Sequence, residues 1–178
     1  DDDRFEPARP QIRRVDGWVC SFVAIGAGTA AEPAQLVVAP VVEDAVLEAV
    51  QQGANVEVTG TDSGATVLGV AAGLRAAISN LLENAVQSAP DEAVDVAISA
   101  DDDRVRIAIR DRGPGLPEAV RERLFSPHVT DRPGGAGMGL YLAQRLVTDV
   151  HGGTLELSDA EDGGTLAVIE LPRGEPEA

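Results

Sequence analysis

The chain has 178 residues, 44% of them hydrophobic, which is enough for one domain with a substantial core. The formal net charge is −16, and all 14 basic residues are arginines, so duplex nucleic acid is a disfavoured partner because its binding needs clustered cations. No apolar run approaches the roughly 20 residues that span a bilayer and no secretory signal is visible, so we expect no membrane contact by this chain.

The strong acidity admits two interpretations. A protein adapted to high salt would be acidic, and so would an ordinary acidic cytoplasmic protein from a GC-rich genome. The single Cys20 cannot form an internal disulfide, which fits a reducing compartment. We therefore expect a cytoplasmic location.

Residues 1–35 show no regular pattern, and regular elements are expected from residue 36 onward. The first of these are a strand over 36–39, a helix over 41–52 that begins after Pro40 and ends at Gly53, and a strand over 55–59. A longer helix over 71–89 carries an apolar stripe at helical spacing and is stopped by Pro90. The stripe consists of Leu74, Ile78, Leu81, Leu82 and Ala85.

The second half of the chain begins with two alternating strands over 94–99 and 104–110, which form a hairpin across an acidic turn. The elements expected after it are a short helix near 118–124, a flexible loop over 126–137, a helix over 138–150 that Gly152 and Gly153 cap, and a hairpin of strands over 154–158 and 165–171. This order predicts an α+β fold: a two-layer α/β sandwich in which a mixed, mostly antiparallel sheet has helices on one face.

Two asparagines stand four residues apart in the expected helix over 71–89. Asn80 and Asn84 share one face, and Gln87 follows within another turn. Asparagine is a mediocre helix former, so the presence of two of them in one helix calls for an explanation. A solvated helix face is one interpretation. The other is that the carboxamides bind a hard cation or phosphate oxygens, since oxygen ligands suit magnesium.

A turn rich in glycine and proline, Asp111-Arg112-Gly113-Pro114-Gly115, ends the strand over 104–110. Two glycines around a proline let the backbone turn sharply and leave room for a flat ligand. The Asp111 carboxylate could accept a hydrogen bond from an exocyclic amine. Taken alone, the motif is equally a tight turn with a solvated carboxylate.

A glycine-rich stretch from Gly134 to Leu140 comes directly before a helix. Backbone without side chains, followed by a helix N-terminus, suits the binding of phosphates. The stretch is not a P-loop, because the Lys-Ser/Thr pair is missing. It is not a dinucleotide fingerprint either, because it follows a loop and not a strand.

In this order and spacing, the motifs resemble those of the histidine kinase branch of the GHKL ATPase superfamily. Asn80-Leu81-Leu82-Glu83-Asn84-Ala85 resembles the N box, Asp111 to Gly115 the first glycine box, Leu124-Phe125-Ser126-Pro127 the F box, and Gly135 to Leu140 the second glycine box. Three further segments resemble the closing hairpin of these kinases: His151-Gly152-Gly153, Gly163-Gly164-Thr165 and Leu171-Pro172. The resemblance spans about residues 36–172 and implies the Bergerat fold, in agreement with the α/β sandwich.

The resemblance implies ATP and Mg²⁺ as cofactors. Asn84 would hold the magnesium, with Asn80 beside it, and these two would be the catalytic side chains. Asp111 would accept a hydrogen bond from the adenine amino group, while Gly113 and Gly115 let the backbone close on the base.

The phosphates would be wrapped by the second glycine box, at the end of a mobile lid over 126–137. The residues implied there are Gly135, Ala136, Gly137, Met138, Gly139 and Leu140. Thr165 would lie near the adenine, and Phe125 would pack against the base of the lid.

Three positions depart from the family pattern, and each change removes one phosphate contact. Gln87 stands where a basic residue is frequent, Asp131 follows Thr130 in place of a lysine, and Ala136 replaces a threonine. Arg132 is the cationic substitute in the lid. The departures predict weakened nucleotide binding, whereas the retained asparagine, aspartate and glycines argue against a degenerate kinase.

Asn80 stands where ATP-hydrolysing relatives have a glutamate that activates water. An amide cannot act as a general base, which favours transfer of the γ-phosphoryl over its hydrolysis. Neither His128 nor His151 lies in the helical His-Glu/Asp context of a phosphoacceptor. His151 is expected to cap a helix and His128 to lie on the lid surface, so the acceptor histidine is expected on a separate dimerisation domain, with a response regulator downstream.

The sequence thus predicts an irregular segment over 1–35 of unknown role, an ATP-binding catalytic domain over 36–173 and a disordered tail over 174–178. The expected function is that of the catalytic domain of a two-component sensor histidine kinase. Two alternatives stay open: an anti-sigma-factor-type serine kinase, and a non-catalytic interaction module with the same fold. The closing hairpin and the phenylalanine in the lid favour the histidine kinase.

Overall fold

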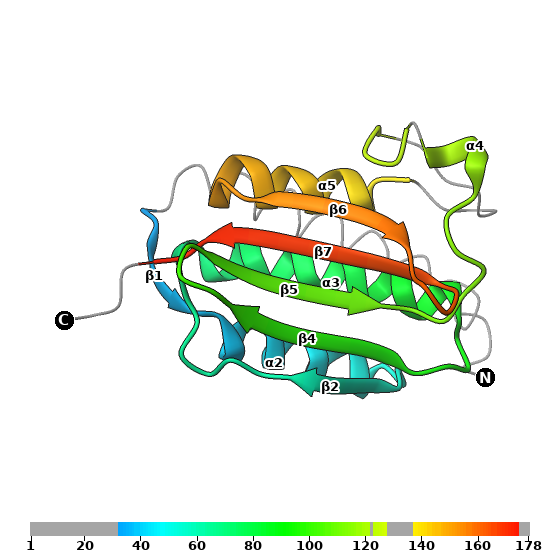
Figure 1. Ribbon diagram of the computed structural model, residues 1–178, viewed down its shortest axis with the longest axis horizontal. Coiled ribbons are helices and arrows are strands. Elements are labelled where there is room, and N and C mark those ends of the chain that lie inside the picture. Colours follow the sequence, from blue (N-terminus) through cyan, green and yellow to red (C-terminus); the bar gives the residue numbers. More distant parts are fainter. Residues whose placement is uncertain (1–31, 122, 128–136, 175–178) are drawn as a thin grey trace, which may run out of the picture.

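The computed structural model describes residues 32–121, 123–127 and 137–174, and it places a five-stranded sheet in front of a layer of helices (Figure 1). The strands are, in spatial order, β2 (Val56–Gly60), β4 (Val94–Ala100), β5 (Arg104–Arg110), β7 (Thr165–Pro172) and β6 (Thr154–Asp159). β2 runs parallel to β4, and the other neighbours are antiparallel. The predicted mixed, mostly antiparallel sheet with helices on one face is confirmed.

The helical layer is centred on α3 (Ala71–Ser88), which packs against α2 (Val38–Gln51) and α5 (Gly139–Arg145). α5 continues without a break into the π-helix η2 (Leu146–Val150). The apolar stripe that the sequence predicts along α3 is buried over its whole length. α4 (Glu118–Arg121) is a single turn, shorter than the helix expected near 118–124.

The core between the layers is aliphatic, as the low aromatic content requires. Alternate residues of the three central strands point inward and are buried, while their neighbours face outward. These inward residues are Val94, Val96, Ile98, Val105, Ile107, Ile109, Ala167, Ile169 and Leu171. Burying each Val, Leu or Ile side chain stabilises the fold by about 1.5–3 kcal/mol.

A second, two-stranded sheet pairs β1 (Ala34–Val37) with β3 (Thr66–Gly69) in antiparallel register. No sequence pattern predicted β3, and the strand expected over 36–39 is wrong in its second half, because Val38 and Ala39 are the first residues of α2. Pro40 therefore occupies the first helical turn, where its missing N–H costs nothing since no intrahelical acceptor exists there. Burial of Val38 and Ala39 favours the helix.

The glycine caps predicted for two helices are confirmed. Gly53 has a left-handed φ of +96° and donates to the Val50 carbonyl, and Gly152, at φ +62°, donates to the Thr148 carbonyl. Across the described residues, none of the helices combines the length and the apolar character that a membrane span requires. The expectations for residues 1–31, for most of the lid and for residues 175–178 lie outside the described residues.

Candidate functional site

The two asparagines of α3 face the first residue of α5. Asn80 is 9% exposed, and its Nδ2 donates to the Ala76 carbonyl at 2.9 Å, which turns its Oδ1 outward from the helix. A Cβ placed on Gly139 would lie 3.5 Å from Asn80 Oδ1 and 3.6 Å from Asn84 Nδ2. The burial of Asn80 contradicts a merely solvated helix face, and Gly139 lets the backbone of α5 approach both carboxamides.

The backbone at the beginning of α5 has the features of an anion-binding helix end. Gly137 is left-handed at φ +64°, Met138 is the residue before the helix, and no side chain of the described residues caps its first turn. The first N–H groups of a helix lack intrahelical acceptors and carry a partial positive charge. Gly137, Met138, Gly139 and Leu140 thus lie together at a surface suited to anions.

Asp111 is held rigidly at the end of β5. Its Oδ1 accepts the backbone N–H groups of Gly113, at 2.8 Å, and Thr165, at 3.1 Å, while its own N–H donates to the Thr165 carbonyl. The side chain is only 5% exposed. Because two backbone donors of the described residues occupy Oδ1, Oδ2 is the oxygen that remains for a further donor.

Ser88 connects the asparagine pair of α3 to the turn after β5, and no sequence motif pointed to it. A Cβ on Gly113 would lie 2.1 Å from Ser88 Oγ, so the end of α3 packs directly on the turn after β5. Ser88 follows Asn84 by four residues, or about 6 Å along the helix. The spacing Asn80, Asn84, Ser88 was the signal that could have found it, since residues four apart share a helix face.

The β6–β7 hairpin closes over the same turn. Gly164 is left-handed at φ +88°, and a Cβ there would lie 1.9 Å from the Asp111 carbonyl oxygen, so only glycine fits. Asp159, at the end of β6, accepts the Leu116 N–H at 3.0 Å and pairs with the Arg121 guanidinium. The hydrogen bond from Arg121 lowers the pKa of Asp159 below its ordinary value, with a further contribution from the Leu116 N–H.

The remaining predicted site residues have different placements. Gln87 is exposed, and its amide donates to Glu83 Oε1 at 2.8 Å. Phe125 is partly buried and packs against the core. Arg132, Gly135 and Ala136, together with Thr130, Asp131 and His128, lie outside the described residues.

His151 caps a helix, as predicted. The ring is 5% exposed; its Nδ1 lies 2.8 Å from the Leu146 carbonyl oxygen and its Nε2 3.2 Å from the Val70 nitrogen. With the proton on Nδ1, the ring donates to the Leu146 carbonyl and accepts the Val70 N–H; Nε2 also lies 3.2 Å from the Val70 carbonyl oxygen, to which the other tautomer would donate. The ring therefore links the end of the α5–η2 helix to the beginning of α3.

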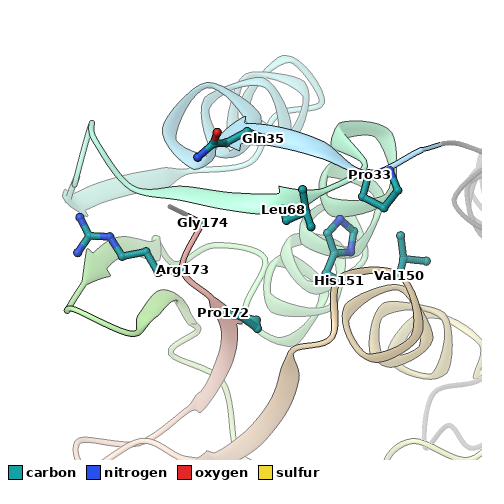
Figure 2. A pocket seen from close by; sticks show the side chains of 8 residues that line it. All are labelled: Pro33, Gln35, Leu68, Val150, His151, Pro172, Arg173 and Gly174. Carbon is teal, nitrogen blue, oxygen red and sulfur yellow. The ribbon is translucent and has the colours of Figure 1, made fainter. Parts of the chain in front are cut away.

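A cavity of about 550 Å³ lies beside this histidine (Figure 2). Leu68, His151, Pro33 and Val150 gather on one side of it, and the Arg173 side chain extends on the other. The full lining is Pro33, Gln35, Leu68, Val150, His151, Pro172, Arg173 and Gly174. None of the predicted site residues lines it, so it is distinct from the cluster around α3.

Comparison with known proteins agrees with this geometry. Residues 69–175 match the family model described as histidine kinase-, DNA gyrase B-, and HSP90-like ATPase. The chain is 33% identical to sporulation kinase A of Bacillus subtilis (strain 168) over 101 residues, which is 56% of this chain and 16% of that protein. It is 38% identical to the sensor protein KdpD of Mycobacterium tuberculosis (strain CDC 1551 / Oshkosh) over 104 residues, 55% of this chain and 12% of that protein.

Among solved structures, the mycobacterial sensor histidine kinase MprB superposes with a TM-score of 0.68 at 30% identity, covering 82% of this chain and 99% of that one. The chain belongs to the family of histidine kinase-, DNA gyrase B- and HSP90-like ATPases. Within that family its relatives are sensor histidine kinases, and the resemblance to their catalytic and ATP-binding domain is confirmed. The chain spans about a sixth or less of the two curated relatives.

Proposed function

We propose that this chain binds Mg-ATP as the catalytic domain of a two-component sensor histidine kinase and transfers the γ-phosphoryl to a histidine on a separate dimerisation and phosphoacceptor domain. A response regulator would receive the phosphoryl group next. The observation that carries the proposal is the row of Asn80, Asn84 and Ser88 on α3. This row runs from the beginning of α5, beside Gly139, to the turn held by Asp111.

The base would be selected by Asp111. With Oδ1 bound to two backbone N–H groups, Oδ2 is fixed in place and can only accept a hydrogen bond while the group is ionised. The exocyclic amine of adenine is a suitable donor. Guanine presents a carbonyl oxygen at the equivalent position, and two acceptors facing each other would leave both unpaired.

The phosphates would lie toward the beginning of α5, where N–H groups without intrahelical partners face Asn80 and Asn84. The Asn84 amide oxygen would be the protein ligand of a magnesium ion, which prefers oxygen and usually keeps several waters and phosphate oxygens as its other ligands. When bound, magnesium would supply charge neutralisation for the transferring phosphoryl group.

Asn80 supports transfer over hydrolysis. Its amide is neutral and its Nδ2 already donates to the Ala76 carbonyl, so it offers no base to activate water. In the transfer step the bond from the γ-phosphorus to the β,γ-bridging oxygen breaks, its electron pair leaves with ADP, and an acceptor nitrogen bonds to phosphorus. Gln87, whose amide donates to Glu83, is a weaker candidate for a phosphate contact than a basic residue would be.

Calorimetric titration with a non-hydrolysable ATP analogue, with and without Mg²⁺, tests the proposal. In Asp111→Asn the amide oxygen can still accept from Gly113 and Thr165, but an NH₂ group replaces the free acceptor. We expect magnesium-dependent binding by the native chain and a loss of about tenfold to a hundredfold in the variant. Asp162→Asn, a change on the exposed tip of the β6–β7 hairpin, is the control and should bind normally.

Absence of binding at millimolar analogue would reject the proposal in favour of a non-catalytic interaction module. The serine kinase alternative is separated by the product: phosphohistidine is lost in acid, whereas phosphoserine survives it.

A further inference from the structure

One carboxylate, that of Asp159, holds two segments that are remote from it in sequence. Its Oδ1 accepts the backbone N–H of Leu116 at 3.0 Å, and its Oδ2 pairs with the Arg121 guanidinium. Leu116 belongs to the turn after β5 and Arg121 to α4, and both contact Asp159, the last residue of β6. The end of β6 therefore sets where this turn and α4 lie.

The same carboxylate accounts for Gly115. This glycine is left-handed at φ +83°, and a Cβ there would lie 3.0 Å from Asp159 Oδ1. The carboxylate thus occupies the side on which a side chain would project. The left-handed backbone favours glycine at position 115, and a side chain there would also displace the Asp159 carboxylate, whatever ligand the turn binds.

The turn from Asp111 to Leu116 is consequently fixed by a carboxylate at each end. Asp111 Oδ1 accepts the N–H of Gly113 near its start, and Asp159 Oδ1 accepts the N–H of Leu116 at its finish. Only the first carboxylate faces the predicted base position. The second is half exposed on the outer side of the turn.

Arg121 orients the outer carboxylate. Its guanidinium lies between Asp159 and Glu118, with an Nε to Glu118 Oε2 distance of 3.2 Å. Both partners of the Arg121–Asp159 pair are substantially exposed, and such pairs contribute little to global stability. We therefore expect the pair to fix the position of the turn and to add little to the free energy of unfolding of the chain.

We propose that Asp159, oriented by Arg121, is a positioning residue for the base-binding turn: it holds Gly115 and Leu116 in the conformation that lets Asp111 receive adenine. This inference rests on the proposed function. It predicts that removal of the outer carboxylate weakens nucleotide binding without unfolding the chain.

The first measurement needs no nucleotide. Amide hydrogen exchange of Leu116 is followed by NMR in the native chain, Asp159→Ala, Asp159→Asn and the control Asp162→Ala. Asp162 lies on the same hairpin, is 86% exposed and approaches Arg110 only at 3.6 Å, so its loss removes the same charge without touching the turn. We expect exchange to rise about tenfold in Asp159→Ala and to change little in Asp159→Asn, which keeps an acceptor, and in the control.

The second measurement is titration of the same four proteins and of Arg121→Ala with the ATP analogue and Mg²⁺, beside thermal unfolding. Asp159→Ala should bind about fivefold to tenfold more weakly at an unchanged melting temperature. Asp159→Asn should recover most of that loss, and Arg121→Ala should show an intermediate loss because the Leu116 bond remains.

The outcomes distinguish failure of the positioning role of Asp159 from failure of the proposed nucleotide-binding function. Unchanged Leu116 exchange in Asp159→Ala overturns the positioning role, and so does faster exchange with unchanged nucleotide affinity. If the native chain itself does not bind the analogue, the proposed function fails and the positioning role fails with it, even where the exchange result shows that the contact exists.

Discussion

The imidazole of His151 occupies the space that a side chain on Gly69 would need. A Cβ on Gly69 would lie 2.2 Å from His151 Cδ2, closer than any two such carbons can approach. Gly69 ends β3, and the ring bonds Val70 immediately after it. The glycine and the histidine therefore form one unit at the junction of β3 and α3.

We predict that Gly69→Ala destabilises the chain by about 1–3 kcal/mol through overpacking, as measured by urea unfolding. In a His151→Ala background the same change should lower the free energy of unfolding only slightly, because the imidazole ring is no longer there. Gly60→Ala is the matched control: it is also a strand glycine, but its new Cβ would make only ordinary contacts at 3.6 Å. Equal costs of Gly69→Ala in both backgrounds would disprove the coupling.

Asn84 should determine the magnesium dependence of binding. For Asn84→Ala we expect the enhancement of analogue affinity by Mg²⁺ to fall by about tenfold or more, the loss of one charge-assisted contact, while binding without metal changes little. Calorimetry over a range of Mg²⁺ concentrations measures this. Asn55→Ala, an exposed asparagine before β2, is the control, and an undiminished magnesium effect in Asn84→Ala would remove Asn84 from the metal site.

The Asp159 carboxyl should titrate below its ordinary pKa of 3.8, because the hydrogen bond from Arg121 and the Leu116 N–H both favour the ionised form. A folded pKa below the unfolded value means that the small contribution of this exposed pair to stability is present above about pH 4 and is lost as the pH falls through the folded pKa. Arg121→Ala should raise the Asp159 pKa toward 3.8. Carboxyl ¹³C titration by NMR checks this, and an unchanged pKa would show that Arg121 does not orient the group.

Stability should depend on the inward face of the sheet and not on exposed apolar residues. Changing Ile107, which is buried on β5, to alanine should lower the free energy of unfolding by about 2–5 kcal/mol, because a cavity remains in the core. Changing Leu68, which is 60% exposed on β3, to alanine should alter the free energy of unfolding by no more than about 0.5 kcal/mol. Urea unfolding of the two variants compares them directly, and similar losses would mean that Leu68 is covered in solution.

The sheet and its main helices could be predicted because their periodicity is strong. The strands over 94–99 and 104–110 alternate cleanly, and the stripe of α3 follows helical spacing. The boundary at Val38 could not be predicted in the same way. The apolar run from Leu36 to Val42 fits either a strand or a helix, and contacts with the rest of the fold decide. β3 is only four residues long and depends on pairing with β1, far away in the sequence.

In the candidate site, too, the residues in local motifs could be predicted and the contacts between remote residues could not. Asn80, Asn84, Asp111 and the glycines stand in local motifs, and their spacing reveals them. The contact of Asp159 with Leu116 joins residues 43 apart, and that with Arg121 joins residues 38 apart. No local pattern encodes such pairs, so only the folded hairpin brings them together.

The π-helical turn of η2 has a consequence for changes in chain length. Its wider winding accommodates one residue more than an α-helix would over the same rise, and His151 follows it directly. Deleting one residue from 146–150 would let the helix close into regular α geometry and leave the residues after it in place, because the residue removed is the extra one. A deletion within the regular α-helix over 139–145 would instead rotate everything after it by about 100° around the axis and turn the imidazole away from Val70, so η2 should accept a deletion that α5 rejects.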